Sequence, residues 1–141
     1  MRATCPSRKF RAINCSAIPE QLLESELFGY TPGAFTGSLK DGKKGILEIC
    51  NGGTVQLDEV NKMPKYHQEK MLRVLQEGQI NKVGSSDVTK IDILFIAVTN
   101  EDLARKVEEG SFAKDLYDRL SGEVLRLRPL LARRKNSAYI N

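Results

Sequence analysis

The sequence predicts an α/β fold in which a parallel sheet is flanked by helices. Two apolar runs of strand length carry this prediction: Gly52–Val60, which starts on a glycine pair, and Ile91–Val98, the most continuous apolar run in the chain. Helix-like patterns precede the first run, at Pro19–Leu27, and separate it from the second, at Pro64–Glu77. Strands that alternate with helical segments are typical of parallel sheets, whose strands are buried by the helices.

The first elements are marked by their boundary residues. Phe10–Asn14 alternates and ends on a polar amide, which predicts a short strand. Pro19 is tolerated in a first helical turn and Gly29 is placed to end a helix, so we expect a helix between them. Its apolar face is predicted to consist of Leu22, Leu23 and Leu27. Beyond the glycine-rich stretch that follows, we expect a polar turn at Asp41–Lys44 and a short, partly helical or irregular piece at Ile46–Cys50.

The second half of the chain is also predicted to alternate helices with strands. The helix Pro64–Glu77 is predicted to bury Met71, Leu72 and Leu75 and to keep His67 on the surface. Ile91–Val98 is expected to be a central strand of the sheet. The remaining expected elements are Gln79–Val83, a turn at Gly84–Ser86, a helix Asn100–Glu109 closed by Gly110, a helix Phe112–Leu120 capped by Ser111, and a last strand Val124–Leu127 ended by Pro129.

Composition and charge restrict the classes of function. The 141 residues, of which 40% are hydrophobic and 28% charged, suffice for one soluble domain, 1–141. Because no apolar run reaches the length of a membrane span and no secretory signal is visible, we expect a cytoplasmic protein without membrane contact. Three cysteines and one histidine form no zinc pattern. The net charge is +4, and the basic end either contacts nucleic acid or, as the lack of interleaved aromatics favours, is solvated: Arg126, Arg128, Arg133, Arg134 and Lys135.

The stretch Glu26–Ser38 reads ELFGYTPGAFTGS and carries a glycine at every fourth position from Gly29. Glycines at this spacing stop a helix and allow turns with positive φ, so a protruding loop is predicted, with Phe35 and Thr36 at its tip. Phe35 has two interpretations. It either folds back onto the core, or it is exposed and contacts another molecule.

This stretch closely resembles the ELFG…GAFTGA signature of bacterial sigma-54-dependent transcriptional activators, which are AAA+ ATPases. The resemblance covers about residues 10–134, and Ser38 stands where the family usually has alanine. It implies that the loop engages sigma-54 RNA polymerase and that Phe35 is exposed. The residues it implies for partner contact are Gly33, Ala34, Phe35, Thr36, Gly37 and Ser38.

Adjacent carboxylates at the end of the first apolar run also have two interpretations. Asp58 and Glu59 follow a predicted parallel strand, and ligands of open α/β sheets collect at that end of the strands. Such a pair is also typical of a solvated turn. The resemblance implies a Walker B segment, in which Asp58 holds Mg²⁺ and Glu59 polarises the attacking water. Gln56 departs from the usual hydrophobic residue, which indicates either a polar partner or an edge strand.

The resemblance implies functions for three further residues. Asn14 resembles the switch asparagine that holds Glu59 until the sigma factor engages. Asn100 resembles the sensor I residue that reads the γ-phosphate, although Thr99 or Asn100 would also serve as a helix cap. Arg119 matches an arginine that acts on the nucleotide of a neighbouring subunit. The departures from the family pattern are Ala113 for a second such arginine, Leu131 and Ala132 for an Arg–Glu pair, and Leu94 for an arginine that is often found there.

Other parts of the family's ATPase module are not found in the sequence. No G-x-x-x-x-G-K-[ST] phosphate loop occurs, and the nine residues before Phe10 are too few for the family's first strand, phosphate loop and crossover helix. The helical lid and a helix-turn-helix for DNA are also not found. We therefore expect a partial AAA+ (P-loop NTPase-like) α/β subdomain without its first strand and helical lid.

The expected function follows from this resemblance. The intact parent would bind ATP and Mg²⁺, assemble into a ring, remodel sigma-54 RNA polymerase and contact DNA only through other domains. For the chain alone we expect no bound cofactor, no significant ATPase activity and association through unpaired strands. Two alternatives stay open: a non-hydrolysing sigma-factor or protein-interaction module that keeps the loop, and an inactive truncated remnant.

Overall fold

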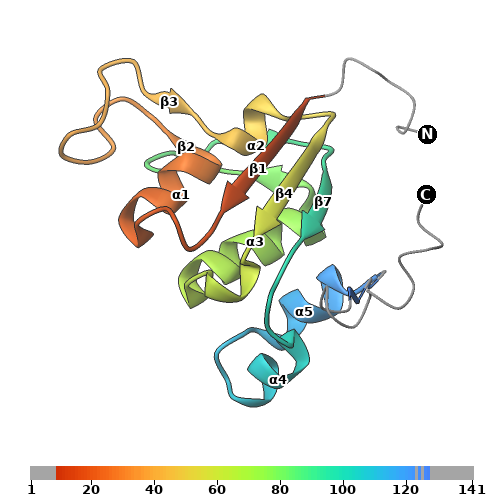
Figure 1. The fold of residues 1–141 in the computed structure, drawn as a ribbon. Coiled ribbons are helices and arrows are strands. Elements are labelled where there is room, and N and C mark those ends of the chain that lie inside the picture. Colours follow the sequence, from red (N-terminus) through yellow and green to blue (C-terminus); the bar gives the residue numbers. More distant parts are fainter. Residues whose placement is uncertain (1–8, 123, 125, 128–141) are drawn as a thin grey trace, which may run out of the picture.

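Three parallel strands form the main sheet of the protein. The computed structural model describes residues 9–122, 124, 126 and 127. In the sheet, β4 (Thr54–Asp58) lies between β1 (Phe10–Asn14) and β7 (Leu94–Ala97) (Figure 1). Phe10 pairs with Thr54, and Thr54 pairs with Leu94, so the three strands start at the same level. The predicted α/β class, a parallel sheet with flanking helices, is confirmed.

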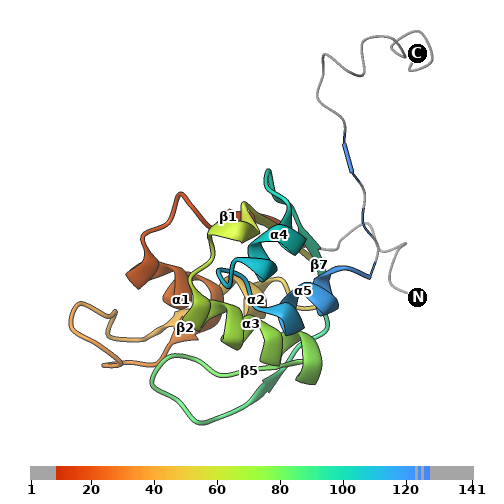
Figure 2. The ribbon, with the colours of Figure 1, turned by 90° about the horizontal axis from the view of Figure 1, so that it is seen from below.

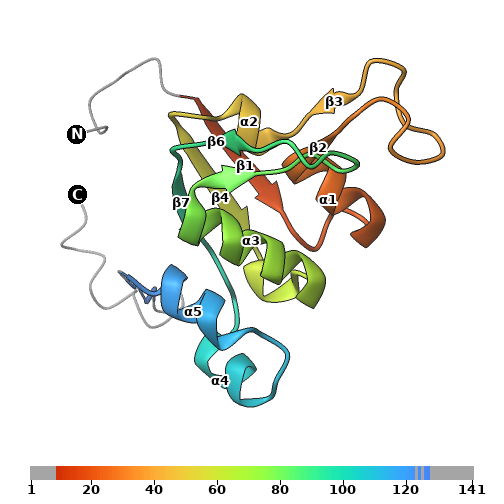
Figure 3. The same ribbon diagram turned by 180° about the vertical axis from the view of Figure 1, so that it is seen from behind.

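The helices lie on one side of this sheet. Opposite views show α1 (Glu20–Phe28), α2 (Ile46–Ile49) and α3 (Lys65–Glu77) on one face, whereas no described element covers the other face (Figures 1 and 3). The short 3₁₀ helix η1 (Val60–Lys62) joins β4 to α3. The helices α4 (Leu103–Glu108) and α5 (Lys114–Leu120) follow β7, and α5 packs beside α3 (Figure 2).

Two small antiparallel ribbons complete the described part. β2 (Gly29–Tyr30) pairs with β3 (Lys43–Lys44), so the predicted polar turn at Asp41–Lys44 ends in a strand. β5 (Gln79–Ile80) pairs with β6 (Thr89–Lys90), so only the start of the predicted piece Gln79–Val83 is a strand. A bridge between Tyr30 and Val83 joins the two ribbons.

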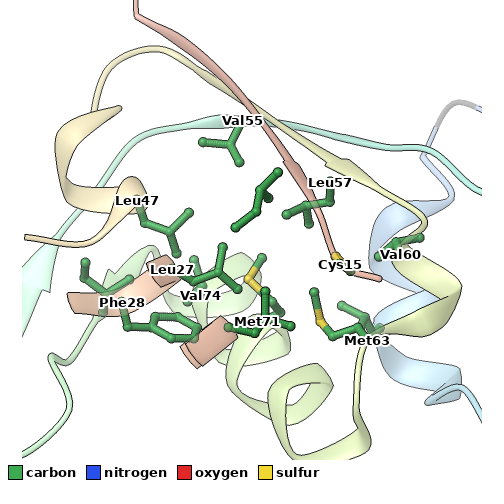
Figure 4. Packing of buried hydrophobic residues seen from close by; sticks show 14 of the residues in the cluster. Cys15, Leu27, Phe28, Leu47, Val55, Leu57, Val60, Met63, Met71 and Val74 are labelled. Carbon is green, nitrogen blue, oxygen red and sulfur yellow. The ribbon is translucent and has the colours of Figure 1, made fainter. Parts of the chain in front are cut away.

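The hydrophobic core fills the space between the sheet and the helices. Figure 4 shows Val55 and Leu57 of β4 facing Leu27 of α1 and Met71 of α3. β4 alternates between buried and half-buried residues, as expected for a strand whose helix-covered face forms the core. Burying one such aliphatic side chain contributes about 1.5–3 kcal/mol to folding. The core thus fixes the strands and, through them, the residues at their ends.

Prolines and glycines set the helix boundaries as predicted. Pro19 and Pro64 are the N-cap residues of α1 and α3, and both helices end at a glycine with positive φ, Gly29 or Gly78. The predicted apolar face of α1 is correct for Leu23 and Leu27, which are buried, but wrong for Leu22, which is exposed. On α3, Met71 is buried, and Leu72 and Leu75 pack against the core.

The position of β7 differs from the prediction. Ile91–Val98 was expected at the centre, but β7 spans only Leu94–Ala97 and lies at the edge of the three-stranded sheet. Of the predicted last strand, Val124, Arg126 and Leu127 are described and none lies in a strand. Pro129 and the C-terminal residues lie outside the described part. Two apolar side chains of β7, Leu94 and Ile96, are exposed, as is Val98, which follows the strand.

His67 is buried, contrary to the prediction of a surface position. Only 4% of the residue is exposed, and its ring packs edge-to-face against that of Tyr66, with centroids 5.5 Å apart. Burial lowers the pKa of His67, while the nearby carboxylates Glu24 and Glu20 raise it and Lys70 lowers it further. His67 thus belongs to the packed side of α3.

The last two helices begin later than predicted. Asp102, and not Thr99 or Asn100, caps α4: its carboxylate accepts the Ala104 N–H at 3.0 Å. α5 begins at Lys114 rather than Phe112, and Ser111 does not cap it. Instead, Gln68 of α3 accepts the Ala113 N–H at 2.8 Å, so a buried side chain satisfies the start of this helix.

Two further observations concern membrane-spanning helices and the cysteines. No helix within the described ranges combines the length and apolar character needed to cross a membrane. Cys15 and Cys50 are free and buried, and Cys5 lies outside the described residues.

Candidate functional site

The carboxyl ends of the three main strands meet at one edge of the sheet. Asn14, the last residue of β1, pairs with Asp58, the last residue of β4. The Val98 N–H donates to the Leu57 carbonyl at 2.9 Å, so the segment from Thr99 starts at the same edge. This edge, which we call the acidic edge, is defined by Asn14, Asp58, Glu59 and Asn100. As predicted, Asp58 and Glu59 lie at the carboxyl end of a parallel strand.

Glu59 has an unusual backbone conformation. Its φ of 50° and ψ of 47° are left-handed, and it is the only non-glycine residue with positive φ among those that the structure describes. Such a conformation costs of order 1–3 kcal/mol and persists only when neighbouring contacts hold it. One such contact is the Val60 N–H, which donates to the Val98 carbonyl at 3.0 Å. The turn after β4 is thus held by its backbone to the residue that follows β7.

Ser16 connects Asn14 with Glu59. The Asn14 Oδ1 accepts the Ser16 N–H at 2.9 Å and lies 2.8 Å from Ser16 Oγ, and the same Oγ contacts the Glu59 carboxylate. A serine hydroxyl has one proton to donate, so it serves one acceptor at a time. Asn14 therefore reaches Glu59 through Ser16. Ser16 was not predicted as a site residue. The signal for it is Asn14, because an asparagine side chain often accepts the backbone N–H two residues later in an Asx-turn.

Gln56 is paired with Asp58 on the open face of the sheet. Its Nε2 donates to Asp58 Oδ1 at 2.6 Å, while β4 is the middle strand. Of the two explanations offered for a polar residue here, a polar partner is correct and an edge strand is wrong. On the other side of β4, burial and, to a lesser extent, the charges of Asp58 and Glu59 together raise the pKa of the Cys15 thiol to about 11, so this thiol is protonated near neutral pH.

The acidic edge fits Mg²⁺ only in combination with other ligands. Mg²⁺ is commonly held by one or two carboxylates together with phosphate oxygens and water. Asp58 supplies one half-buried carboxylate, and the described ranges contain no group of three His, Cys, Asp or Glu side chains placed to hold a metal. The residues present therefore fit a magnesium ion that arrives with a nucleotide, and not a metal bound by protein alone.

A second polar link joins the turn after β4 to the segment after β7. The buried Asn61 donates through Nδ2 to the Glu101 carboxylate and lies 3.5 Å from Asn100 Oδ1. Lys106 of α4 pairs with the same carboxylate at 3.4 Å. The side chain of Asn100 thus lies beside the Asn61 amide, which the bond to Glu101 holds in place. No signal in the local sequence pointed to Asn61.

Arg119 is not part of these contacts. It lies exposed in the last turn of α5. Its predicted role concerns a neighbouring subunit, so it stays a prediction.

The glycine-rich stretch forms a loop that projects from the body of the protein between β2 and β3 (Figures 1 and 3). Three successive turns build it, closed by hydrogen bonds from Ala34 N to Thr31 O, Ser38 N to Phe35 O and Gly42 N to Leu39 O. As predicted, its glycines adopt positive φ: Gly29, Gly33 and Gly37. Phe35 is 40% exposed and Thr36 is exposed, so the predicted exposure of Phe35 is confirmed, although its ring contacts Tyr30; the contact with another molecule stays a prediction.

The base of this loop is tightly packed. A Cβ on Gly29 would lie 2.4 Å from the Lys43 carbonyl oxygen, and one on Gly45 would lie 2.3 Å from the Leu27 carbonyl oxygen. Only glycines allow the backbones to approach this closely. From the other side, Val83 donates to Gly29 at 2.9 Å and accepts from Thr31 at 3.1 Å. A rigid base thus carries an exposed tip.

The family follows from comparison of the whole chain. The model of the sigma-54 interaction domain matches residues 2–126. The chain belongs to the sigma-54 interaction domain family. Similar proteins include the signal-transduction and transcriptional-control protein of Clostridium beijerinckii, 48% identical over 127 residues that cover 90% of this chain and 20% of that protein. The Nif-specific regulatory protein of Azotobacter vinelandii is 47% identical over 126 residues, which cover 89% of this chain and 24% of the relative.

Solved structures agree with the fold of this sigma-54 interaction domain. A crystal structure of NtrX from Brucella abortus superposes with a TM-score of 0.82 and 37% identity, covering 95% of this chain and 29% of NtrX. NtrX in complex with ATP gives a TM-score of 0.79 and 34% identity over 95% of this chain and 30% of NtrX. The chain therefore spans less than a third of the length of these relatives.

Proposed function

We propose that this sigma-54 interaction domain is the sigma-factor-contacting part of a cytoplasmic transcription activator. In the full-length protein, ATP hydrolysis in a ring of subunits would drive the remodelling of sigma-54 RNA polymerase. The observation that carries the proposal is the projecting loop, which leaves Phe35 and Thr36 exposed on a rigid base. The projection makes this phenyl ring accessible to a partner, and aromatic side chains are enriched at protein interfaces.

We assign the acidic edge to the nucleotide. Asp58 would hold magnesium and Glu59 would orient the attacking water, while the Ser16 hydroxyl, set by Asn14, holds the Glu59 carboxylate. The bound ATP would supply the phosphoryl group and the free energy of its transfer. Asn100 would face the terminal phosphate beside Glu59. The phosphate-binding backbone that this chemistry also needs has no matching motif in the 141 residues.

The chain path links the two parts of this proposal. α1 begins shortly after Ser16 and ends at Gly29, where the loop starts. A change in the contact between Ser16 and Glu59 would thus reach the loop through one short helix. The connection supports a role for the acidic edge in controlling the loop.

Binding of the purified chain to fluorescently labelled sigma-54 tests the proposal. We expect saturable binding that Phe35→Ala weakens by roughly tenfold or more, because aromatic residues at the centre of a contact carry much of its free energy. Leu39→Ala is the matched control, because Leu39 is also exposed but lies beyond the motif. Failure of the wild-type chain to bind, or equal binding by Phe35→Ala, would contradict the proposal.

Measuring hydrolysis in parallel separates the two alternatives. Binding through Phe35 without ATP turnover in any context would favour a non-hydrolysing interaction module. Neither binding nor turnover would favour an inactive remnant.

A further inference from the structure

Tyr30 occupies a fixed position at the foot of the projecting loop. It is 6% exposed, although it belongs to a strand of two residues. Its backbone pairs with Lys43 on one side and forms a bridge with Val83 on the other. Both small ribbons therefore hold Tyr30 in place.

The side chain of Tyr30 contacts the loop at two places. Its ring packs edge-to-face against Phe35, with centroids 4.9 Å apart and planes at 71°. Its hydroxyl accepts the Leu39 N–H at 3.2 Å. Phe35 begins the turn that the Ser38 N–H closes, and Leu39 follows that turn, so one buried side chain contacts the loop on both sides of the turn.

We propose that Tyr30 is a positioning residue that presents Phe35 and Thr36 to the partner. The partner half of this inference rests on the proposed function. Gly33 and Gly37 lie in open space, because a Cβ added to either would have no other atom within 4 Å. A loop with such unconstrained glycines would lose much conformational entropy on binding. Holding such a loop in its bound shape beforehand raises affinity by reducing that loss.

The geometry leaves Phe35 available while Tyr30 supports it. The ring meets Tyr30 in a T-shaped contact, and 40% of the residue stays exposed. The opposite role, in which Tyr30 withholds Phe35 from the partner, would make loss of the contact increase binding. The experiment below distinguishes these two roles by the sign of the effect.

Two substitutions separate the contacts. Tyr30→Phe removes the hydroxyl and keeps the ring, whereas Tyr30→Leu removes both. Tyr66→Phe and Tyr66→Leu are matched controls, because Tyr66 is an exposed tyrosine on α3. Protection of the core amides of Val55 and Leu57 against hydrogen exchange verifies that each variant is folded.

The first measurement is hydrogen exchange of the Leu39 amide, which needs no partner. Loss of one hydrogen bond should accelerate this exchange by roughly 2- to 10-fold in Tyr30→Phe, with a larger increase in Tyr30→Leu. The Tyr66 variants should leave it unchanged. Unchanged exchange in folded Tyr30→Phe would show that the hydroxyl does not order the loop and would overturn the inference.

The second measurement is affinity for labelled sigma-54. We expect Tyr30→Phe to weaken binding by roughly 2- to 10-fold and Tyr30→Leu to weaken it more. Unchanged or tighter binding, despite faster Leu39 exchange, would overturn the positioning role. If the wild-type chain did not bind, the proposed function and the partner half of the inference would both fall, while Leu39 exchange would still decide whether Tyr30 orders the loop.

Discussion

The side-chain amide of Asn61, just after β4, donates a hydrogen bond to the carboxylate of Glu101, just after β7. This bond is the main cause that lowers the pKa of Glu101, and Lys106 lowers it further. We predict that Asn61→Ala raises the pKa of Glu101 toward its ordinary value. An NMR titration that follows the Glu101 carboxyl carbon measures the change. Lys106→Ala is the comparison and should also raise the pKa, because Lys106 is the second partner of this carboxylate; an unchanged pKa of Glu101 in Asn61→Ala would contradict the prediction.

Buried His67 should make stability depend on pH. Its pKa is lowered in the folded state, so the unfolded chain binds the proton more tightly. The free energy of unfolding should therefore be highest above the ordinary histidine pKa of about 6.5 and should fall as the pH decreases below it. Urea unfolding between about pH 7 and 5 measures this fall. His67→Leu should reduce the slope, whereas Tyr66→Leu should keep it; the same slope in both variants would assign the effect to other groups.

Phe35→Ala should change stability little. The ring is partly exposed, and its edge-to-face contact with Tyr30 is worth only about 0.5–1.5 kcal/mol. Phe112→Ala is the matched comparison, because Phe112 is 2% exposed and its removal should cost about 3–5 kcal/mol. Urea or thermal unfolding gives both values. Similar losses in the two variants would mean that Phe35 belongs to the core.

The chain alone should not hydrolyse ATP at a significant rate. Phosphoryl transfer depends on positioning and charge neutralisation of the phosphates, and the acidic edge supplies carboxylates and amides but no cationic side chain: Asn14, Asp58, Glu59 and Asn100. Release of phosphate from ATP and Mg²⁺ should equal that of the Glu59→Gln variant. A turnover that Glu59→Gln abolishes would refute this prediction.

The isolated chain should self-associate through β7. This strand pairs only with β4 in the described sheet, and its outer residues Leu94 and Ile96 are 51% and 41% exposed. An apolar strand edge tends to pair with another chain, and an edge lysine prevents this. Light scattering should therefore show association that Ile96→Lys abolishes. Val88→Lys, at an exposed valine outside the main sheet, is the control; a wild-type monomer at all concentrations would contradict the prediction.

Boundary residues made much of the fold predictable. Phe10–Asn14 matches β1, and the proline and glycine positions gave the ends of α1 and α3. The sequence pattern of α3 also contained the signal for His67, which precedes Met71 by one helical turn on the same face. The position of β7 depended instead on the order of strands, which local pattern does not encode. Ser16 and Asn61 were missed for a related reason, since their partners, Glu59 and Glu101, are distant in sequence and follow other strands.

The parallel sheet also governs how the protein folds. Phe10 must find Thr54, and Thr54 must find Leu94, so no pairing within this sheet is local in sequence. Chain-closure entropy opposes such pairings until the intervening segments have collapsed, whereas a helix such as α3 forms from neighbouring residues. During synthesis, β1 is made before β4 and β4 before β7, so each edge of a strand stays unpaired until its partner strand has been made. We therefore expect assembly of the sheet to be slower than formation of the helices, and the early strands to be unpaired while the later ones are still being made.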